Sequence, residues 1–320
     1  MELTDTAEKI KKMEIRGAGR IARAAVEALR DFSSGTDETD PALYRRKMEA
    51  AAAVLLATRP TAVSLPNAVH LIMTAIDPSL TTEGAKNAVA RRAGEFISSS
   101  LSAVERIAVI GAHHIRDGDV ILTHCNSEVA LACILEAHRQ GREIEVFATE
   151  VRPRNQGLVT IRALNDAGIK THYIVDSAAR YFMNDIDLVV VGADAVTVNG
   201  AVVNKIGTSQ IALAAHEART NFIVAAETYK FAPRTIRGEL IEIEERDSEE
   251  VLPADVARSL PMVRVRNPAF DVTPPEYIDL IITEEGAVPP QMAYVIIRDY
   301  LGWGIDEFHR EPGIRGHTQE

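Results

Sequence analysis

The sequence contains little cysteine: there are two residues, Cys125 and Cys133, in a chain of 320. Two thiols are too few for a zinc-binding knuckle, so we predict no metal site. No run approaches the roughly 18 apolar residues that span a membrane. Residues 1–12 are charged and lack the apolar core of a signal peptide. Together these absences predict a protein of the reducing cytoplasm with no membrane partner.

Positive charge is also scarce, with 35 Lys and Arg against 46 Asp and Glu, for a net charge of −11. A general nucleic-acid binder needs a basic face, so the composition predicts no nucleic-acid partner. It leaves room for a small basic pocket that binds a phosphorylated metabolite. The hydrophobic fraction of 46% is typical of a globular protein with a full core, built as one large domain or two ordinary ones.

The first hundred residues have helical periodicity, because apolar side chains recur every three or four positions. Asp40 followed by Pro41 is a typical helix start, with the acid as the cap and proline at the first helical position. The helices that we expect here cover residues 21–30, 41–57, 67–76, 84–100 and about 104–112.

Apolar strands then alternate with helices, which is typical of a mostly parallel sheet. The predicted strands cover residues 120–123, 143–149, 172–175, 188–191, 222–226 and 280–282. We therefore expect an α/β fold: a small helical N-terminal domain, residues 1–112, followed by a Rossmann-like, mostly parallel sheet flanked by helices, residues 113–320. The acidic run at 239–250 is expected to be a solvated surface excursion.

Cys125 follows the first of these strands and precedes a helix. The carboxyl ends of strands are where such sheets place their chemistry, and a helix N-terminus lowers a thiol pKa. The alternative is a small buried hydrophobic residue, the role expected of Cys133 in mid-helix. His124 beside the thiol could polarise it, although such a histidine is more often a packing residue.

Asp194 follows the apolar strand 188–191 in the same way. Desolvation at an apolar strand end would raise the pKa of this carboxyl and keep it available as an acid. The alternative is a cap or turn residue. Asn199 and Gly200, just beyond it, are typical of a hairpin turn.

Two segments could bind an anion. Asn204 and Lys205 precede a glycine and a helix start, where backbone N–H groups attract negative charge. The segment of Arg16, Gly17, Ala18 and Gly19 opens an N-terminal helix with two glycines that allow a phosphate to approach. Neither segment has the spacing of a nucleotide P-loop or of a dinucleotide fingerprint.

Arg59 precedes Pro60 at a helix end, and Lys230 lies beyond the fifth strand. Both are candidate phosphate ligands. The alternatives are an arginine that pairs with the last carbonyls of its helix and an ordinary surface lysine.

The motifs together resemble a known superfamily, which unites sugar-1-phosphate aldose–ketose isomerases with regulatory subunits of the translation initiation exchange factor. The resemblance extends from Arg16 to Pro290. Its motifs, in chain order, are Thr123-His124-Cys125-Asn126, Glu150-Val151-Arg152-Pro153-Arg154-Asn155-Gln156-Gly157, Gly192-Ala193-Asp194, Asn199-Gly200 and Asn204-Lys205-Ile206-Gly207-Thr208.

Within the superfamily the chain is most similar to the archaeal ribose-1,5-bisphosphate isomerases, which act in nucleoside monophosphate breakdown. The resemblance implies that Cys125 and Asp194 are catalytic. It implies a phosphorylated pentose as substrate, bound by the contacts of that branch: Arg16 to Gly19, Arg59, Asn204, Lys205 and Lys230. Arg152 and Gln156 are expected to organise the loop over the pocket.

Two differences separate the chain from the sibling methylthioribose-1-phosphate isomerases. Ser127 stands where the sibling tends to have glycine, and Lys230 stands where it has a neutral stretch. A second phosphate needs a cation, whereas a methylthio group needs an apolar pocket, so Lys230 favours the bisphosphate. The methylthioribose isomerase and a non-catalytic regulatory subunit remain the alternatives; the regulatory branch has usually lost the Cys–Asp pair.

The implied reaction needs acid–base groups and no cofactor or metal. We expect Asp194 to protonate the ring oxygen and Cys125 to act as the base at carbon. An enediolate path and a hydride shift both remain open. The resemblance further implies a homo-oligomer of dimers assembled into a hexamer. Substrate could close the helical domain, with Arg16 and Arg59, onto the sheet.

Overall fold

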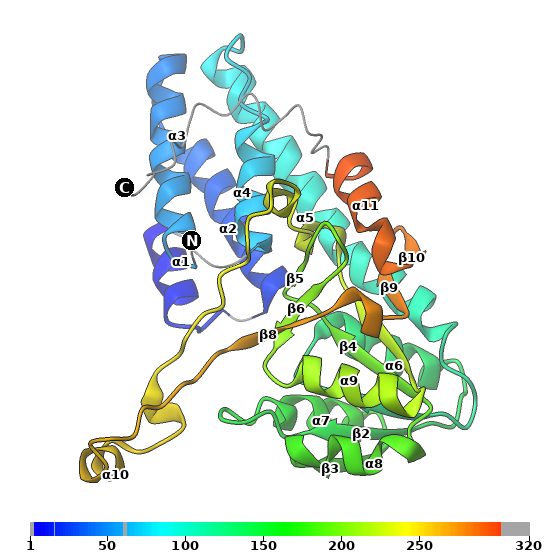
Figure 1. The fold of residues 1–320 in the computed structure, drawn as a ribbon. Coiled ribbons are helices and arrows are strands. Elements are labelled where there is room, and N and C mark those ends of the chain that lie inside the picture. The colour runs from blue at the N-terminus through cyan, green and yellow to red at the C-terminus, as the bar shows by residue number, and fades with distance from the viewer. Residues whose placement is uncertain (1–2, 16, 60–62, 302–320) are drawn as a thin grey trace.

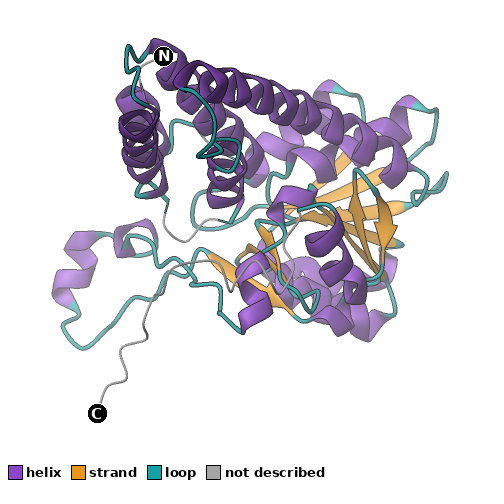
Figure 2. Cartoon of the chain, turned by 90° about the horizontal axis from the view of Figure 1, so that it is seen from above, coloured by secondary structure: helices purple, strands orange, loops and turns teal. Residues whose placement is uncertain are grey.

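The computed structural model describes residues 3–15, 17–59 and 63–301 (Figure 1). The N-terminal part is helical, as predicted, and lies beside the sheet (Figure 2). Its helices are α1 (Leu3–Lys11), α2 (Ala18–Gly35), α3 (Pro41–Leu56), α4 (Ser64–Met73) and α5 (Thr82–Ala112).

Helix α3 begins as the sequence predicts. The Asp40 carboxylate accepts a hydrogen bond from the backbone N–H of Leu43 at 2.8 Å, and Pro41 occupies the first helical position. Helix α5 differs from the prediction, because it is one continuous helix of 31 residues instead of two. The serine-rich stretch near Ser100 favours a break, but tertiary packing overrides this weak preference: Ser100 and Ala103 are both buried.

A seven-stranded sheet forms the second part of the molecule, in the order β10-β9-β7-β4-β1-β2-β3. Every pairing is parallel except that of β9 with β10. The six parallel strands are those predicted from the sequence, and β10 was missed. The strands are β1 (Val120–Thr123), β2 (Glu145–Thr149), β3 (Lys170–Ile174), β4 (Leu188–Gly192), β7 (Asn221–Ala225), β9 (Leu280–Thr283) and β10 (Gly286–Val288).

Helices cover both faces of this sheet, because alternate strand residues point to opposite sides. Ile121, Val190 and Ile223 join a core with the C-terminal end of α5 and with α6 and α7. Leu122 and Val189 join another core with α8, α9 and α11. The bounds are α6 (Glu128–Arg139), α7 (Gly157–Asp166), α8 (Ala179–Phe182), α9 (Thr208–Ala218) and α11 (Ala293–Asp299).

A small antiparallel sheet, which the sequence did not predict, lies beyond the end of β4. It has the order β5-β6-β8, with β5 (Ala195–Val196), β6 (Val202–Lys205) and β8 (Phe270–Thr273). The hairpin turn predicted at Asn199 and Gly200 joins β5 to β6, and Gly200 has φ +83°. Asn204 and Lys205 therefore lie on a strand and not in a loop.

Residues 239–268 form an arm that leaves the body, with α10 (Ala254–Ser259) near its tip (Figure 1). At its root the two legs pair, and the N–H of Arg246 donates to the carbonyl of Asn267 at 2.9 Å. The arm contains the acidic run predicted as a surface excursion, but Glu244 and Glu250 turn back toward the body as partners of arginines.

The helical part has a core of its own, drawn from α1 to α5 with Tyr229 as the sheet domain's contribution. The division at residue 112 stays a prediction, because α5 runs from this core into that of the sheet. Across the described ranges, no helix has the length and apolar character needed to cross a membrane.

Candidate active site

Cys125 and Asp194 follow β1 and β4, which are neighbouring parallel strands. Here the strand order reverses, since the chain builds outward through β2 and β3 on one side and through β7 and β9 on the other. Sheets of this kind bind ligands in the crevice at such a switch point. The topology therefore brings the predicted thiol and the predicted acid to one place.

The loop after β1 holds Cys125 in an unusual backbone conformation, with φ +70°. Its thiol donates to Oε1 of Gln156 at 3.6 Å, and its carbonyl accepts from the Thr160 hydroxyl at 2.8 Å. Gln156, expected to organise the loop over the pocket, is thus a direct neighbour of the sulfur. A non-glycine residue at positive φ stores backbone strain, which is common at functional sites.

Burial raises the pKa of the Cys125 thiol to about 11, and nearby Lys205 only partly offsets this effect. The expectation that the helix N-terminus would produce a thiolate is therefore wrong for the free protein. The N-terminus of α6 is capped by Ser127, whose Oγ accepts from the N–H of Ala130 at 3.3 Å. Desolvation outweighs the remaining dipole, so the free thiol is protonated at neutral pH.

Asp194 is anchored by its N–H, which donates to the carbonyl of Val203 at 2.9 Å. Burial raises the pKa of this carboxyl, against the cations Lys230, Lys205 and Arg59, which lower it. The direction is the one predicted from the apolar strand. A carboxyl with a raised pKa suits a general acid.

Lys205 extends from β6 toward both groups, since its charge lowers the pKa of Cys125 and of Asp194. Its ammonium lies 4.6 Å from the centre of the Phe270 ring. Asn204 is buried, and its Nδ2 donates to the Thr208 hydroxyl at 3.0 Å. Lys205 is the residue of this pair that faces the reacting groups.

The N-terminus of α9 is not an open anion site, contrary to the sequence expectation. The Asp271 carboxylate accepts from the N–H of Gly207 at 2.8 Å and from that of Ser209 at 3.1 Å. Asp271 comes from β8, which the sequence did not predict, so its capping role was not foreseen. The Thr208 hydroxyl at the same helix start donates to the carbonyl of Lys205 at 2.6 Å, which ties Lys205 to α9.

Arg16 lies outside the described residues. Gly17 precedes α2 with φ +85°, a conformation that favours glycine, and, apart from its chain neighbours, no atom of the described residues lies within 4 Å of where its side chain would be. The Ala18 carbonyl accepts from the Ser64 hydroxyl at 3.3 Å. A side chain at Gly19 would lie 2.7 Å from the Tyr229 hydroxyl, so only glycine fits there.

Arg59 pairs with Glu244 of the arm at 3.1 Å, and not with helix carbonyls. It also acts on Asp194, whose pKa it lowers. Lys230 is not a surface lysine: it is 6% exposed, and its ammonium lies 2.7 Å from the Glu227 carboxylate. A buried carboxylate thus already balances the cation expected to bind phosphate.

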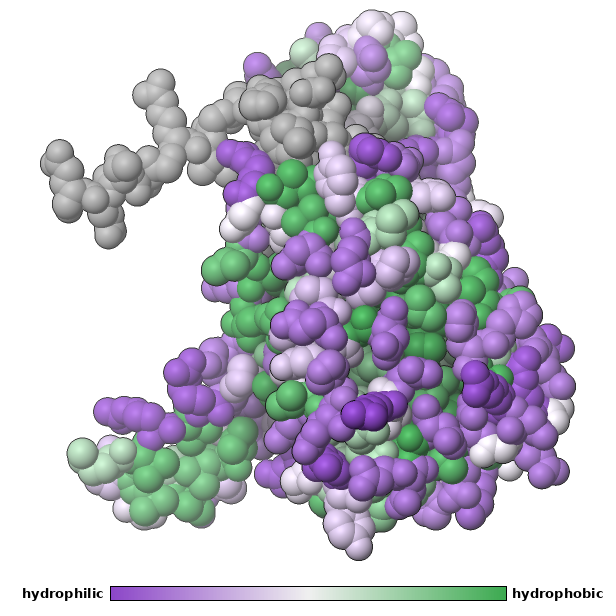
Figure 3. Space-filling model, turned by 45° about the vertical axis from the view of Figure 1, so that its right-hand side comes forward, coloured by the Kyte–Doolittle hydropathy of each residue, from purple (hydrophilic) through white to green (hydrophobic). Residues whose placement is uncertain are grey.

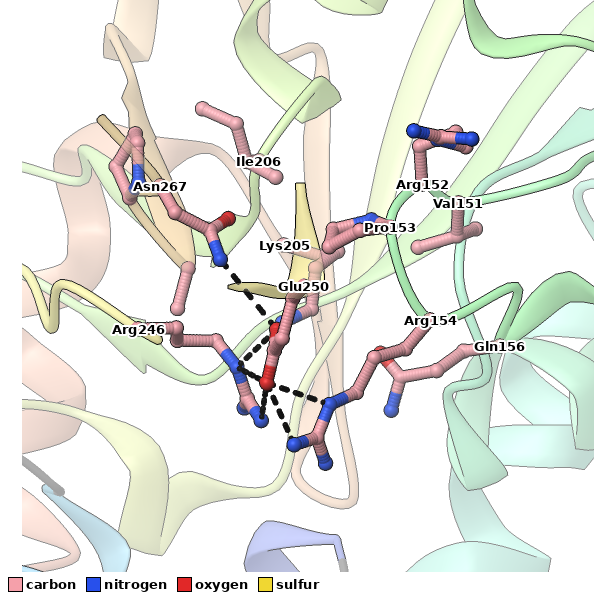
Figure 4. A pocket seen from close by; sticks show the side chains of 12 residues that line it. Val151, Arg152, Pro153, Arg154, Gln156, Lys205, Ile206, Arg246, Glu250 and Asn267 are labelled. Atoms are coloured by element: carbon pink, nitrogen blue, oxygen red, sulfur yellow. Dashed lines mark hydrogen bonds and ion pairs between the residues drawn. The ribbon is translucent and has the colours of Figure 1, made fainter. Parts of the chain in front are cut away.

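A pocket with both charged and apolar lining residues opens beside Gln156 and Lys205 (Figure 4). Arg154 and Arg246 point toward Glu250 in this view, and their guanidinium groups lower the pKa of Glu250 to about 2. Arg152 turns away from them, and its backbone N–H donates to Asp176 at 2.8 Å. Sequence reasoning missed Arg246 and Glu250, because the arm that carries them has no periodic pattern.

His124 does not act on the thiol. Its Nε2 faces the carbonyl oxygen of Ile206 at 2.9 Å and must carry the proton, so Nδ1 accepts from the Thr149 hydroxyl at 2.6 Å. Burial lowers the pKa of this imidazole, which is neutral. It ties the Cys125 loop to the segment that follows Lys205.

Within the described ranges, no cluster of three or more His, Cys, Asp or Glu side chains is arranged to hold a metal ion. Sequence reasoning also missed Glu227, which follows β7 and is buried. The rule that identified Cys125 and Asp194, a polar residue after a buried parallel strand, applies equally to Glu227 and could have found it.

Comparison with known proteins identifies the family. The model of the Initiation factor 2 subunit family matches residues 14–290. The chain belongs to this family. It is 55% identical to the ribose 1,5-bisphosphate isomerase of Methanocaldococcus jannaschii over 301 residues, 94% of this chain and 96% of that one. It is 53% identical to the ribose 1,5-bisphosphate isomerase of Archaeoglobus fulgidus, over 96% of each chain.

Solved structures of this family share the fold. A translation initiation factor eIF-2B of Pyrococcus horikoshii matches with a TM-score of 0.78 and 33% identity, over 90% of this chain and 97% of that one. The 5-methylthioribose 1-phosphate isomerase of the same organism matches with a TM-score of 0.76 and 31% identity, over 94% and 87%. The fold alone therefore does not separate isomerases from translation factors.

Proposed function

We propose that this chain is an aldose–ketose isomerase that converts ribose 1,5-bisphosphate to ribulose 1,5-bisphosphate. The observation that carries the proposal is the meeting of Cys125 and Asp194 at the switch point of the sheet, with Lys205 acting on both. Relatives named ribose 1,5-bisphosphate isomerase, at 55% and 53% identity over nearly the full length, support the choice of substrate.

The reaction begins with ring opening. The anomeric oxygen carries a phosphate, so the ring cannot open as that of a free sugar does. Asp194 donates its proton to the ring oxygen as the bond from C1 to that oxygen breaks. Burial raises the pKa of this carboxyl, which favours the protonated form that this step needs.

The next steps move hydrogen from C2 to C1. The Cys125 thiolate takes the proton from C2, which leaves an enol. The resulting thiol then protonates C1 while the Asp194 carboxylate takes the proton of the C2 hydroxyl, and both groups return to their starting states. The active form therefore has a proton on Asp194 and none on Cys125. Lys205 favours the thiolate against the burial that opposes it.

The anionic ends of the substrate need cations and free N–H groups. We assign them to the segment from Arg16 to Gly19, to Arg59 and to Lys230, with Asn204 and Lys205 at the sugar. The open space over Gly17 and the electrostatic effect of Arg59 and Lys230 on Asp194 support this assignment. Because Arg59 and Lys230 are held by Glu244 and Glu227, phosphate must compete with or join these carboxylates.

Ketose formation from ribose 1,5-bisphosphate by the purified chain tests the proposal, with Cys125→Ser as the inactive variant. Cys133→Ser is the matched control, because Cys133 is buried in the core between α5 and α6 and is bonded to backbone carbonyls. Loss of turnover in the first variant and its retention in the second are expected. Equal activity in both variants would contradict the role of Cys125.

We also propose that the protein forms dimers that assemble into a hexamer in the cytoplasm. The arm supports contact with a second copy: none of the residues of α10 is buried, and Met262 beside it is 92% exposed. Figure 3 shows apolar side chains gathered at the tip of the arm. Both cysteines of the chain are free thiols, as the reducing cytoplasm favours.

A further inference from the structure

The turn after β7 contains a buried ion pair whose carboxylate has no predicted role. Glu227 is 2% exposed, and its Oε2 lies 2.7 Å from the ammonium of Lys230, three residues later. Its other oxygen accepts a hydrogen bond from the Tyr229 hydroxyl at 2.9 Å. Buried carboxylates are rare, and one that is held on both oxygens is fixed in position.

The helical domain holds this turn from one side. The side-chain amide of Asn67 on α4 donates to the carbonyls of Tyr229 and Phe231, at 2.8 Å each. The Tyr229 ring packs against Phe96 with ring centres 5.5 Å apart, and its hydroxyl lies 3.3 Å from that of Ser100. Tyr229 thus connects the core of the helical domain to the carboxylate of Glu227.

The first turn of α2 lies close to the same carboxylate and to the Tyr229 hydroxyl. A side chain at Gly19 would lie 2.7 Å from the Tyr229 hydroxyl and 3.2 Å from Oε1 of Glu227. Arg23, one turn later, donates to the Ser100 hydroxyl at 2.9 Å. Glycine at position 19 therefore lets the backbone assigned to a phosphate lie close to Glu227 and Tyr229.

The ion pair between Glu227 and Lys230 also affects the pKa of Asp194. Among the charges that act on Asp194, Lys230 has the largest effect in favour of the carboxylate, and Glu227 opposes it. A lysine without its partner would leave an uncompensated cation beside the acid and would favour loss of its proton. The pair thus supplies an ammonium close to Asp194 while it limits the excess of positive charge there.

We propose that Glu227 is a positioning residue, which fixes Lys230 beside Asp194 and, through Tyr229, fixes the first turn of α2 against the same site. The inference rests on the proposed isomerase function, because it gives Asp194 the role of acid. It explains how Lys230 and Gly19, far apart in sequence, both lie close to the same buried carboxylate.

Among the described residues, charged and titratable groups face Glu227 and its partners from several elements. Lys230 and Tyr229 belong to its own turn, Arg23 comes from α2 and Asp194 follows β4. Glu284, which directly follows β9, holds the same turn: its carboxylate accepts from the N–H and hydroxyl of Thr228. Glu284 anchors the same turn but makes no ion pair with Lys230, which makes it the matched control.

The test replaces Glu227 by Gln and measures the pH dependence of kcat/KM. The acid limb of the profile carries the pKa of Asp194, because the active form needs a protonated acid and an ionised thiol. Without the carboxylate, Lys230 is unopposed, and this limb should move down by about one pH unit. The plateau should fall by about tenfold, since each unit of pKa changes the protonated fraction tenfold.

Glu227→Asp should recover part of the plateau, and Glu284→Gln should leave the acid limb in place even if it lowers the melting temperature. A folded Glu227→Gln protein with the wild-type limb, or an equal shift in Glu284→Gln, would overturn the inference.

A second readout separates this inference from the proposed function. Carbon-13 NMR titration of labelled Asp194 needs no substrate, and Glu227→Gln should lower the pKa of that carboxyl by the same amount whether or not the sugar is turned over. If the wild-type protein does not turn over the sugar but Glu227→Gln still lowers the pKa of Asp194, only the proposed function is overturned. An active protein without it would overturn the role of Glu227.

Discussion

Cys125 and Asp194 follow neighbouring strands, yet burial raises the pKa of both. Both groups therefore hold their protons more strongly than usual. The proton that Asp194 holds is useful for ring opening. The proton on Cys125 must leave before this thiol can act as a base, and that requirement determines how the rate depends on pH.

The first prediction concerns Asp194→Asn. Turnover should fall by about 10²-fold or more, because the amide has no proton to donate to the ring oxygen, while binding of the sugar phosphate should remain. Measurement of kcat together with substrate affinity by calorimetry checks this. Retained turnover would contradict the assignment of the acid.

The same variant should also be more stable at neutral pH. A carboxyl whose pKa is raised by folding loses stability as the pH rises from its ordinary value of 3.8 through its folded value, because the unfolded chain ionises first. Asparagine cannot ionise, so the melting temperature of the variant should exceed that of the wild type at pH 8 and match it at pH 3. A lower melting temperature at pH 8 would show that Asp194 is stabilised by its cations.

The second prediction is a bell-shaped dependence of kcat/KM on pH with a distant alkaline limb. The thiol of Cys125 has a pKa of about 11, so the alkaline limb should lie near that value. The acid limb should lie above the ordinary range of a carboxyl, because burial raises the pKa of Asp194. Between the two limbs the rate should be flat, because the protonated fraction of Asp194 falls with rising pH as fast as the ionised fraction of Cys125 rises. An alkaline limb below pH 8 would place the thiolate in the resting enzyme.

The third prediction concerns the ion pair between Arg59 and Glu244, 3.1 Å apart. Glu244→Gln should lower KM for the bisphosphate, because it frees Arg59 from a competing carboxylate, and Arg59→Ala should raise it. Glu245→Gln is the control, since that residue pairs with Arg266 instead. Steady-state kinetics at low salt would reveal the difference. A higher KM in Glu244→Gln would mean that this carboxylate orients Arg59 for the substrate.

The fourth prediction concerns assembly. Met262→Lys at the tip of the arm should reduce the mass measured by light scattering, because a charge replaces an apolar contact with the second copy. Tyr181→Lys is the control, as Tyr181 is 80% exposed on α8, away from the arm. An unchanged mass in Met262→Lys would exclude the tip from the interface.

The sequence predicts the parallel sheet well, because each of its six strands is a short apolar run between polar residues. It also predicts Cys125 and Asp194, since both follow such strands. The small sheet is harder to predict: β5 has two residues, and β6 pairs with β8 across more than sixty positions of sequence. Propensity cannot identify strands that exist only through non-local pairing.

Charge states were the least predictable part of the site. From the sequence, the N-terminus of α9 resembles an anion site, but in the structure the Asp271 carboxylate occupies it. Lys230 resembles a surface residue, but in the structure it pairs with buried Glu227. Asp271 lies far from α9 in the sequence, and Glu227 lies in an irregular turn. Whether desolvation or the dipole of helix α6 determines the pKa of Cys125 likewise depends on packing, which a local sequence pattern does not predict.

The most direct test of the central claim is turnover of the purified protein with ribose 1,5-bisphosphate and, in parallel, with methylthioribose 1-phosphate. We predict ketose formation from the bisphosphate and little or none from the methylthio sugar, because Arg59 and Lys230 place cations near Asp194 that a second phosphate can bind. Turnover of the methylthio sugar alone would contradict the claim about substrate and retain the mechanism. No turnover of either sugar by folded protein would contradict the isomerase function itself and favour a regulatory role.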